Sequence, residues 1–428
     1  MELKKYKLGE ILDVTRGASL SGEFYAAKGE YVRLTCGNFD YQNNCFKENK
    51  AKDNLYYIGD FKPDFLMKEG DIITPLTEQA IGLLGSTAII PESGKYIQSQ
   101  DVAKIVCKEH LLDKDFAFYL ISSNLVKQQL SAAAQQTKIR HTSPDKIKDC
   151  IVWIPELEEQ KRIGKLLRTI DLKIELNRQL NQNLEAMAKQ LYDYWFVQFD
   201  FPDENGKPYK SSGGKMVWDK RLKREIPLLW KAKIVEEVAD VYNGATPSTV
   251  NELNYGGDIV WITPKDLSDQ KQKFVYQGER NISQVGYDSC STHLLPSNTI
   301  LMSSRAPIGL LAIAKTELCT NQGFKSFVSK SKNIATYLYY YLQYHITQIE
   351  QLGTGTTFKE VSREDILKFP MLKPSDNVLD LWEEIVSALN DRQLEIQKEN
   401  ENLIKQRDEL LPLLMNGQVS VNSDLADD

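Results

Sequence analysis

The sequence predicts an α+β protein: two duplicated mixed α/β domains joined by two long antiparallel coiled-coil helices, arranged as a pseudo-twofold dumbbell. Three observations predict this fold. Apolar residues recur every seven positions between residues 157 and 196, where no proline interrupts them, and a second such spacing precedes the C-terminus. The two halves of the chain also resemble each other at a period of about 220 residues, which is typical of a duplicated module.

The composition is that of a folded globular protein. Of the 428 residues, 42% are hydrophobic and 26% are charged, which suits two or three domains. No apolar run approaches the roughly 18 residues of a membrane span, and no apolar segment of a signal peptide follows the N-terminal residues. We therefore expect a cytoplasmic protein.

The net charge of −6 is unevenly distributed along the chain. Residues 375–428 carry 4 basic and 13 acidic side chains, whereas the other 374 residues carry 49 basic and 46 acidic ones. The acidity therefore lies in the C-terminal helix and tail, and the rest of the chain can present local basic surfaces. The overall charge neither supports nor excludes a nucleic-acid partner.

The long helices are predicted from their heptad spacing. About 37 helical residues would form a rod roughly 55 Å long, and a polar residue in its apolar seam, Asn177, would fix the register at some cost in stability. One long helix inside an ordinary globular core is the alternative. The residues expected to pair the helices are Ile163, Leu167, Ile170, Ile174, Leu184, Leu191, Leu389, Ile396, Leu403 and Leu410.

Short apolar runs bounded by Gly, Pro, Asn and Asp predict strands in the first domain, with one helical segment at 116–130. These strands are expected at 31–34, 71–74, 88–90, 103–106 and 150–154. Gly and Ser mark an exposed linker after the central helix, and Pro412 and Gly417 are expected to stop the last helix. The predicted organisation is domain 1 at 1–156, central helix 157–200, linker 201–230, domain 2 at 231–374, C-terminal helix 375–417 and acidic tail 418–428.

Short strings recur in order in the two halves, and they identify the duplication. Gly17-Ala18 returns as Gly244-Ala245, and Ile81-Gly82-Leu83-Leu84 returns unchanged as Ile308-Gly309-Leu310-Leu311. Each copy ends at a proline, Pro155 or Pro374, after which a long helix begins. The natural partner of each helix is then the other helix.

Catalytic and metal-binding patterns are not found in the sequence. The six cysteines and four histidines are scattered, without a C-x-x-C or H-E-x-x-H pattern, so we expect no metal site. There is no phosphate-binding G-x-x-x-x-G-K-[ST] loop, and Gly353-Thr354-Gly355 follows a helix-like segment rather than a strand. The Asp203-Glu204 pair lies in the predicted linker, where a preorganised nuclease site is hard to build. The chain is therefore predicted to hold other molecules in position rather than to catalyse a reaction.

Polar loops are the candidate binding residues. They combine Thr, Ser, Asn, Gln, Arg and Lys with Gly or Pro, which can supply phosphate donors and contacts to base edges. Ordinary turn chemistry is the alternative for any single loop. The candidates in the first copy are Thr35, Asn38, Thr77, Gln79, Gln100, Lys138, Arg140 and His141; in the second copy they are Thr246, Lys265, Asp266, Ser304, Arg305, Asn321, Gln322, Lys325, Thr356 and Lys359.

The ordered set of motifs resembles the DNA-specificity (S) subunit of type I restriction–modification systems over essentially the whole chain. In the first half its marks are Pro155 with Glu158-Glu159-Gln160 and Ile163, the run 184–188 to Trp195-Phe196, and Phe201-Pro202 with 209–214. In the second half they are Gly244-Ala245-Thr246-Pro247, Thr320-Asn321-Gln322-Gly323, residues 353–357 and residues 407–417. The first domain departs from the pattern, with Arg16-Gly17-Ala18-Ser19 and Ser99-Gln100-Asp101 at the matching places.

The resemblance implies two target-recognition domains, each reading one half of a bipartite asymmetric double-stranded DNA site, with a spacer set by the helices. It also implies that two methyltransferase (M) subunits dock on the helices and that two restriction (R) subunits join them. S-adenosylmethionine, ATP and magnesium would then belong to the partner subunits, and this chain would be a non-catalytic specificity subunit. Two other interpretations remain open: the specificity part of a type IIB-like modification enzyme, and a coiled-coil scaffold with two protein-binding lobes.

Overall fold

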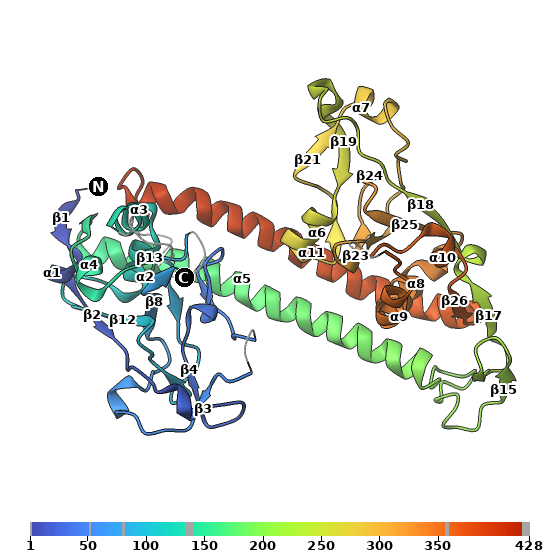
Figure 1. Ribbon diagram of the computed structural model, residues 1–428, viewed down its shortest axis with the longest axis horizontal. Coiled ribbons are helices and arrows are strands. Elements are labelled where there is room, and N and C mark those ends of the chain that lie inside the picture. Colours follow the sequence, from blue (N-terminus) through green and yellow to red (C-terminus); the bar gives the residue numbers. More distant parts are fainter. Residues whose placement is uncertain (1, 51–52, 79–81, 134–139, 356–358, 422–428) are drawn as a thin grey trace. The chain divides into compact units, whose positions relative to one another are not determined.

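The computed structural model describes residues 2–50, 53–78, 82–133, 140–355 and 359–421 (Figure 1). The chain divides into two compact units: unit 1 comprises Met1–Leu176 with Glu401–Asp428, and unit 2 comprises Asn177–Asn400. The chain passes from one unit to the other only inside two long helices, α5 (Leu157–Tyr192) and α11 (Asp376–Met415). Each unit therefore contains one globular domain and part of both helices.

Unit 1 contains two four-stranded sheets. The strands of its antiparallel main sheet, in spatial order, are β10 (Ala88–Ile89), β8 (Ile72–Pro75), β12 (Val102–Cys107) and β2 (Leu12–Arg16). Those of the second sheet are β11 (Tyr96–Ile97), β4 (Tyr31–Arg33), β7 (Tyr56–Tyr57) and β3 (Tyr25–Ala26), with β11 and β4 parallel. Strand pairs β1 (Lys4–Lys7) with β14 (Ile151–Ile154), β5 (Phe39–Asp40) with β6 (Cys45–Phe46), and β9 (Thr77–Glu78) with β13 (Arg140–His141) complete the unit.

Short helices and turns connect the strands of unit 1. They are α1 (Leu8–Ile11), α2 (Lys114–Ser122), α3 (Asn124–Ala133) and α4 (Pro144–Lys148), with 3₁₀ turns η1 (Gly22–Phe24), η2 (Cys36–Asn38) and η3 (Pro63–Phe65). The helical segment expected at 116–130 is thus two helices. Ser123 separates them because its backbone is extended, with φ −65° and ψ 151°.

Unit 2 repeats this plan. Its main sheet has the spatial order β18 (Ala239–Asn243), β25 (Phe324–Ser329), β22 (Ile300–Ser304), β23 (Ile308–Ala314) and β20 (Phe274–Val275). The second sheet has the order β21 (Arg280–Ile282), β19 (Tyr255–Ile262) and β24 (Cys319–Thr320). The pairs β15 (Met216–Asp219) with β16 (Arg224–Pro227), and β17 (Lys231–Ile234) with β26 (Pro370–Lys373), lie outside these sheets.

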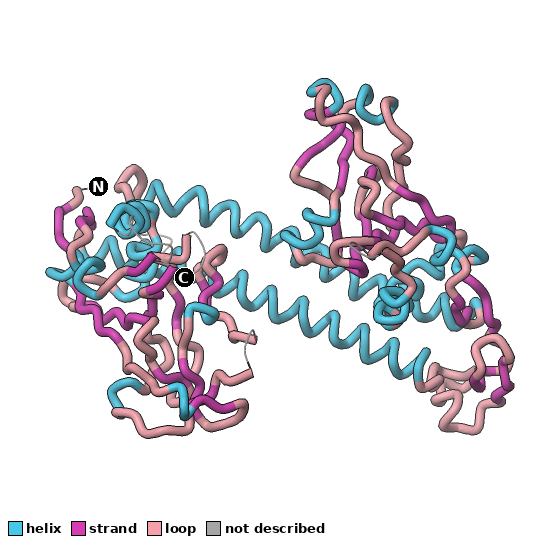
Figure 2. The backbone as a smooth tube through the Cα atoms, viewed as in Figure 1, coloured by secondary structure: helices cyan, strands magenta, loops and turns pink. Residues whose placement is uncertain are grey.

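Short helices complete unit 2, and α7 among them lies at its protruding end, beyond β19 and β21 (Figure 1). They are α6 (Pro264–Gln270), α7 (Gln284–Asp288), α8 (Ala335–Tyr344), α9 (Ile346–Gln351) and α10 (Arg363–Leu367), with 3₁₀ turns η5 (Val235–Glu237), η6 (Glu252–Asn254) and η7 (Lys332–Ile334). In each unit the main and second sheets lie to one side of the long helices, whereas the strands β15 and β16 of unit 2 lie beside the end of α5 (Figure 2).

The two main sheets show that the domains are duplicated. Strands β2, β12, β8 and β10 of unit 1 follow the same neighbour order as β18, β25, β22 and β23 of unit 2. Both second sheets contain a parallel pair, β11 with β4 and β24 with β19. The glycine of the repeated Ile-Gly-Leu-Leu string keeps its backbone conformation as well, since Gly82 and Gly309 have φ of 93° and 95°, a region that favours glycine. The predicted duplication is confirmed.

The long helices pair antiparallel within each unit. In unit 1, Arg407 of α11 donates to Asp171 of α5 at 2.9 Å. In unit 2, Asn177 Nδ2 of α5 donates to Asn400 Oδ1 of α11 at 3.0 Å, and Gln393 donates to the Asn181 carbonyl oxygen at 3.2 Å. In these contacts the residue numbers of α11 decrease as those of α5 increase, so the two helices run antiparallel, as expected. Asn177 is buried in the seam and is hydrogen-bonded there, which is how a polar residue can specify register.

Most expected pairing residues of the two helices lie on buried faces. Ile163, Leu167, Ile174 and Ile396 are fully buried. Leu410 packs on a core of unit 1, and Leu191 and Leu389 pack on the large core of unit 2. Ile170, Leu184 and Leu403 are half-buried.

Two expectations about the segments around the helices are wrong. Pro412 lies inside α11, which continues to Met415, because a proline removes only one helical hydrogen bond this close to the end. The segment 201–230 is folded rather than flexible, although many of its residues are exposed as expected. Phe201 and Trp230 stack at 4.9 Å in the core of unit 2, and β15 and β16 form a hairpin beside them, since apolar residues spaced too irregularly to predict an element still find a common core.

Candidate nucleic-acid interface

Polar loops of unit 2 meet at one end of its main sheet. Strand β25 is antiparallel to both β18 and β22, with Asn243 opposite Lys325 and Ser303 opposite Phe324. The ends of β18 and β22 therefore lie beside the start of β25. This topology brings together loops that are about 80 residues apart in the sequence.

The first contact at this end is between the loops after β18 and before β25. The Thr246 hydroxyl donates to the Gln322 side-chain oxygen, and both residues are exposed. The loops approach closely because Gly244 has no side chain: a Cβ atom there would lie 2.1 Å from the Thr320 carbonyl oxygen. Asn321 accepts from the Gly323 backbone N–H at 2.9 Å and so shapes the turn. Thr246, Asn321 and Gln322 are predicted contact residues from two separate loops, and the structure brings these loops together.

A charged network forms the second contact at this end of the sheet. Lys325 Nζ lies 3.2 Å from Glu360 Oε1, and the Arg305 guanidinium lies 3.8 Å from Glu360 Oε2. The Lys325 side chain is buried, whereas Arg305 is partly exposed, so Glu360 compensates the buried charge and holds the Arg305 guanidinium at the surface. The sequence did not point to Glu360, because a carboxylate in a loop carries no pattern of its own.

Five of the predicted contact residues instead support the loops from inside. Asp266 caps α6 by accepting from the Thr263 backbone N–H at 2.7 Å, and Asn38 accepts from the Thr35 N–H at 2.9 Å. The members of this group have buried side chains committed to hydrogen bonds or ion pairs within their unit: Thr35, Asn38, Asp266, Ser304 and Lys325. Thr35, Asn38 and Asp266 take part in turns and caps, which was the alternative interpretation for single loops, whereas Ser304 and Lys325 belong to strands β22 and β25.

The remaining candidates of unit 2 are surface residues. Lys265 is exposed and pairs with Glu279 at 2.8 Å. Lys359 is exposed beside the network of Glu360. Thr356 lies outside the described residues.

Unit 1 presents fewer candidates at the equivalent sheet end. Strand β9 pairs with β13 so that Thr77 is opposite His141, and the Thr77 hydroxyl lies 3.3 Å from His141 Nδ1. Gln100 is exposed, and its carbonyl oxygen accepts from Arg16 Nε at 2.8 Å. Arg16 is an exposed candidate that the sequence analysis missed, and its position directly before the Gly17-Ala18 loop is the signal that could have found it. Gln79 and Lys138 lie outside the described residues, as does the side chain of Arg140, whose backbone belongs to β13.

A buried lysine attaches the recognition domain of unit 2 to its helices. Lys273 Nζ contacts Glu185 Oε2 of α5 at 2.8 Å, Asn390 Oδ1 of α11 at 2.7 Å and the Tyr340 hydroxyl at 2.6 Å. Burial lowers the pKa of Lys273 to about 8, although Glu185 acts in the opposite direction. The residue lies directly before β20, so this ion pair connects the edge of the main sheet to both helices. In unit 1 the Tyr119 hydroxyl contacts Asp171 of α5 at 2.5 Å.

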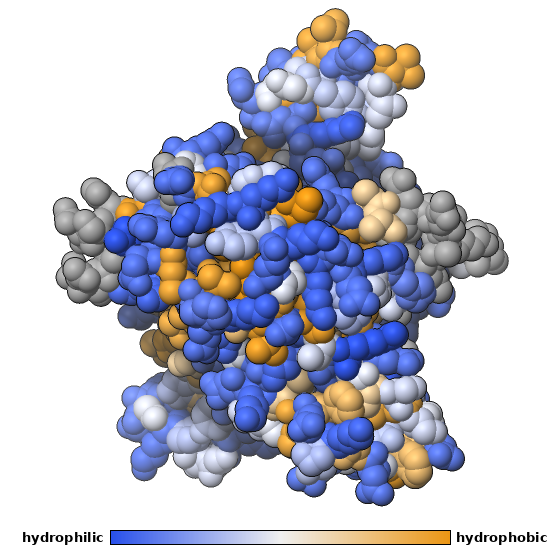
Figure 3. Space-filling model, turned by 90° about the vertical axis from the view of Figure 1, so that its left-hand side faces the viewer, coloured by the Kyte–Doolittle hydropathy of each residue, from blue (hydrophilic) through white to orange (hydrophobic). Residues whose placement is uncertain are grey.

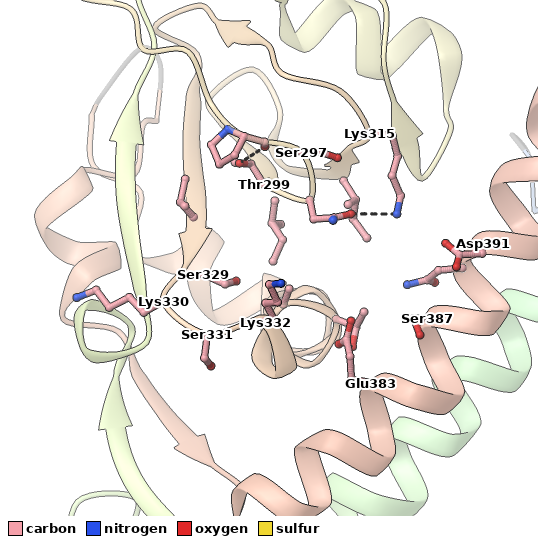
Figure 4. A pocket seen from close by; sticks show the side chains of 18 residues that line it. Ser297, Thr299, Lys315, Ser329, Lys330, Ser331, Lys332, Glu383, Ser387 and Asp391 are labelled. Carbon is pink, nitrogen blue, oxygen red and sulfur yellow. Dashed lines mark hydrogen bonds between the residues drawn. The ribbon is translucent and has the colours of Figure 1, made fainter.

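A cavity of about 590 Å³ lies at the other end of the main sheet of unit 2 (Figure 4). Its walls include Ile300, Ile313 and Ser329, at strand ends remote from the loops, and it is bounded by α11. Lys315 contributes a positive charge, and Glu383, whose pKa is raised by burial, accepts from the Thr336 hydroxyl at 2.5 Å. Charges of both signs line this cavity, so it does not offer the uniformly positive surface that a phosphate backbone requires.

Two further properties bear on function. Among the helices in the described part of the chain, none combines the length and apolar character that crossing a membrane requires. Across the same residues, no three His, Cys, Asp or Glu side chains gather as they would around a metal ion.

The repeated scaffold with two different sets of polar loops defines a duplicated two-domain recognition protein. The family described as the type I restriction modification DNA specificity domain matches residues 1–186 and 227–406, and the chain belongs to this family. It is therefore a DNA-recognition subunit of the specificity class, which is non-catalytic, and the scaffold and type IIB-like interpretations are not favoured.

Known relatives agree with this assignment. The chain is 25% identical to the type I restriction enzyme HindI specificity subunit of Haemophilus influenzae, over 97% of this chain and 99% of that protein. It is 35% identical to the type I restriction enzyme MjaIX specificity subunit of Methanocaldococcus jannaschii, over 45% of this chain and 46% of that protein, so this match spans about half of each. The fold is similar to the crystal structure of a type I restriction–modification S subunit from M. genitalium, with a TM-score of 0.62, 15% identity and coverage of 97% and 96%.

Proposed function

We propose that each unit reads one half of a bipartite, asymmetric double-stranded DNA sequence. The observation that carries this proposal is the combination of one scaffold with two different sets of loop residues. The main sheets have the same strand order, yet exposed Thr246, Gln322 and Arg305 of unit 2 have no identical counterparts beside Arg16 and Gln100 of unit 1. Two related scaffolds with unlike side chains would read two unlike half-sites.

Within unit 2, the exposed side chains have the chemistry of base readout. An arginine guanidinium pairs with the guanine edge, and a glutamine amide pairs with the adenine edge. Arg305 and Gln322 supply these groups from neighbouring loops, and Lys265 and Lys359 can contact phosphates. Glu360 orients Arg305, which reduces the side-chain entropy lost when the guanidinium meets a base.

Replacing Arg305 by alanine should weaken binding of the target DNA by about 1–3 kcal/mol, or roughly 5- to 150-fold, and should relax the sequence preference at one base pair. Arg392→Ala, which removes an exposed arginine of α11 paired with Glu395, is the matched control. Fluorescence anisotropy with a set of single-base target variants measures both effects. A uniform loss across all the variants would instead identify Arg305 as a phosphate contact.

The reaction chemistry is assigned to partner subunits. Two methyltransferase (M) subunits would dock on the long helices and methylate adenine with S-adenosylmethionine, and two restriction (R) subunits would use ATP and magnesium to cut unmodified DNA. Exposed apolar residues of α5 support docking along this helix. They are Leu172 and Leu176 in unit 1 and Leu180 and Met187 in unit 2.

Mapping methylated adenines tests the proposal as a whole. A cell that contains this chain and its methyltransferase subunit should methylate one bipartite sequence with an unread spacer. Exchanging residues 1–156 for the first domain of a relative should change one half of that sequence only. Methylation of a single uninterrupted sequence, or a change in both halves, would contradict the proposal.

A further inference from the structure

Each unit carries a small apolar projection at the outer end of its second sheet. We name these projections knob 1 (Phe24 and Ile58) and knob 2 (Val250, Leu253 and Val285). The side chains of knob 2 are 92%, 73% and 54% exposed, and Ile58 of knob 1 is 64% exposed. Figure 3 shows apolar side chains at the protruding end of unit 2, where label α7 stands in Figure 1, on a largely hydrophilic surface. Exposed aliphatic groups that gather in this way mark interaction sites.

The two knobs are built by the same device, although their sequences differ. In each unit a 3₁₀ turn, η1 or η6, leads into a strand that begins with tyrosine. The Tyr25 hydroxyl donates to the Leu20 carbonyl oxygen at 3.1 Å, and the Tyr255 hydroxyl donates to the Pro247 carbonyl oxygen at 2.8 Å. These bonds fasten the loop that carries the turn to the strand behind it.

The partner strand contributes the second part of each knob. Tyr25 is opposite Tyr57, and the Ile58 N–H donates to the Phe24 carbonyl oxygen at 3.1 Å. Tyr255 is opposite Ile282, and the Ser283 N–H donates to the Asn254 carbonyl oxygen at 3.0 Å.

A glycine packs closely against each turn. A Cβ atom at Gly59 would lie 2.6 Å from the Phe24 ring, and one at Gly286 would lie 2.1 Å from the Asn254 carbonyl oxygen. The knobs are therefore preorganised rather than loose, which lowers the entropy cost of docking.

The charge around both knobs argues against DNA as the occupant. Residues 18–30 and 56–64 carry 4 acidic and 2 basic side chains, and residues 246–258 and 280–294 carry 3 acidic and 1 basic, so each knob has a net charge of −2. Exposed Asp60 in unit 1 and Glu252 in unit 2 stand directly beside the apolar groups. A phosphate backbone would be repelled, whereas a protein surface with basic side chains around an apolar centre would be complementary.

We infer that each knob docks one copy of the same protein partner, which presents an apolar pocket with a basic rim. The two knobs have equal charge and similar construction, although their sequences differ. This similarity is what two binding sites for the same partner require. In the complex proposed above, on which this inference rests, that partner is the methyltransferase subunit.

The test uses the complex of this chain with purified methyltransferase subunits. The double variant Val250→Ser/Leu253→Ser removes the two most exposed apolar side chains of knob 2 without creating a charge. Leu229→Ser is the control because Leu229 is 72% exposed in the same unit, away from the knob. We expect the double variant to weaken binding of one methyltransferase subunit about tenfold, or about 1.4 kcal/mol. Ile58→Ser should weaken binding of the other methyltransferase subunit, and Leu229→Ser should change the binding of neither subunit. Sedimentation velocity on dilution measures the binding of the first and of the second methyltransferase subunit. Fluorescence anisotropy with target DNA measures DNA affinity.

Two outcomes would overturn the inference while leaving the proposed function intact. The wild-type complex could methylate its bipartite site while the knob variants assemble unchanged. The variants could also assemble unchanged and bind DNA more weakly, which would place the knobs on the duplex. If the wild-type chain bound no methyltransferase subunit at all, the proposed function would fail, and the inference would fail with it.

Discussion

Replacing Lys273 by methionine is expected to destabilise unit 2 by about 3–5 kcal/mol at neutral pH. The substitution leaves the buried Glu185 carboxylate without the cation that lies 2.8 Å from it, together with the oxygens of Asn390 and Tyr340. Urea unfolding followed by tryptophan fluorescence suits the measurement, because five of the six tryptophans belong to unit 2.

The matched control for this prediction uses the same carboxylate. Lys189 lies 3.7 Å from Glu185 on the exposed side of α5, so Lys189→Met should cost less than about 1 kcal/mol. Equal losses for Lys189→Met and Lys273→Met would show that burial does not determine the strength of the Lys273 pair.

The pH dependence of stability offers a second check on Lys273. Burial lowers its pKa to about 8 from the usual 10.5, so between these values the folded protein binds fewer protons than the unfolded chain. The part of the free energy of unfolding that is linked to this titration is therefore fully present above pH 10.5 and is lost as the pH falls through about 8. As the pH rises from 8 to 10.5, the free energy of unfolding of the wild type should increase relative to that of Lys273→Met. If the two proteins showed the same dependence of stability on pH, the lowered pKa of Lys273 would be contradicted.

Lengthening both long helices together is expected to change the unread spacer of the DNA site and to leave both half-sites intact. The antiparallel pairing places Gln179 of α5 opposite α11 near Ile396, between the contacts of Asn177 with Asn400 and of Asn181 with Gln393. Four residues inserted at both places add about 6 Å, or roughly two base pairs of B-DNA. Methylation mapping measures the spacer directly.

Two results would contradict the spacer prediction. One is an altered half-site sequence, and the other is an unchanged spacer in a complex that still methylates. Inserting four residues in α5 alone is the control, because it shifts Asn177 and the apolar seam out of register with α11. That variant should lose assembly or stability rather than gain a new spacer.

The attachment of each recognition domain to the helices shows how the duplicated units have diverged. Unit 1 uses Tyr119 with Asp171 and Arg407, whereas unit 2 uses Tyr340 with Lys273 and Glu185. The tyrosines occupy equivalent helices, α2 and α8. The ion pairs differ because one cation comes from α11 and the other from the edge of the main sheet.

Local patterns in the sequence were sufficient for the duplication, the two helices and their antiparallel pairing. A heptad spacing and a repeated string such as Ile-Gly-Leu-Leu are properties of neighbouring residues, so they can be read before any tertiary contact is known. The five strands expected in the first domain correspond to β4, β8, β10, β12 and β14 for the same reason. Strand β2 of the main sheet, strands β3, β7 and β11 of the second sheet, the break at Ser123 and the folded segment 201–230 were not predicted.

Only the tertiary structure decided which polar residues face solvent. Asp266 and Lys325 were expected in polar loops, yet Asp266 caps helix α6 and Lys325 lies in strand β25, buried against Glu360, 35 residues away. Arg16 and the two knobs show the opposite case, since exposed groups with interaction chemistry carried no motif. Burial depends on partners brought from distant segments by the sheets and helices, and side-chain type along the chain does not reveal those partners.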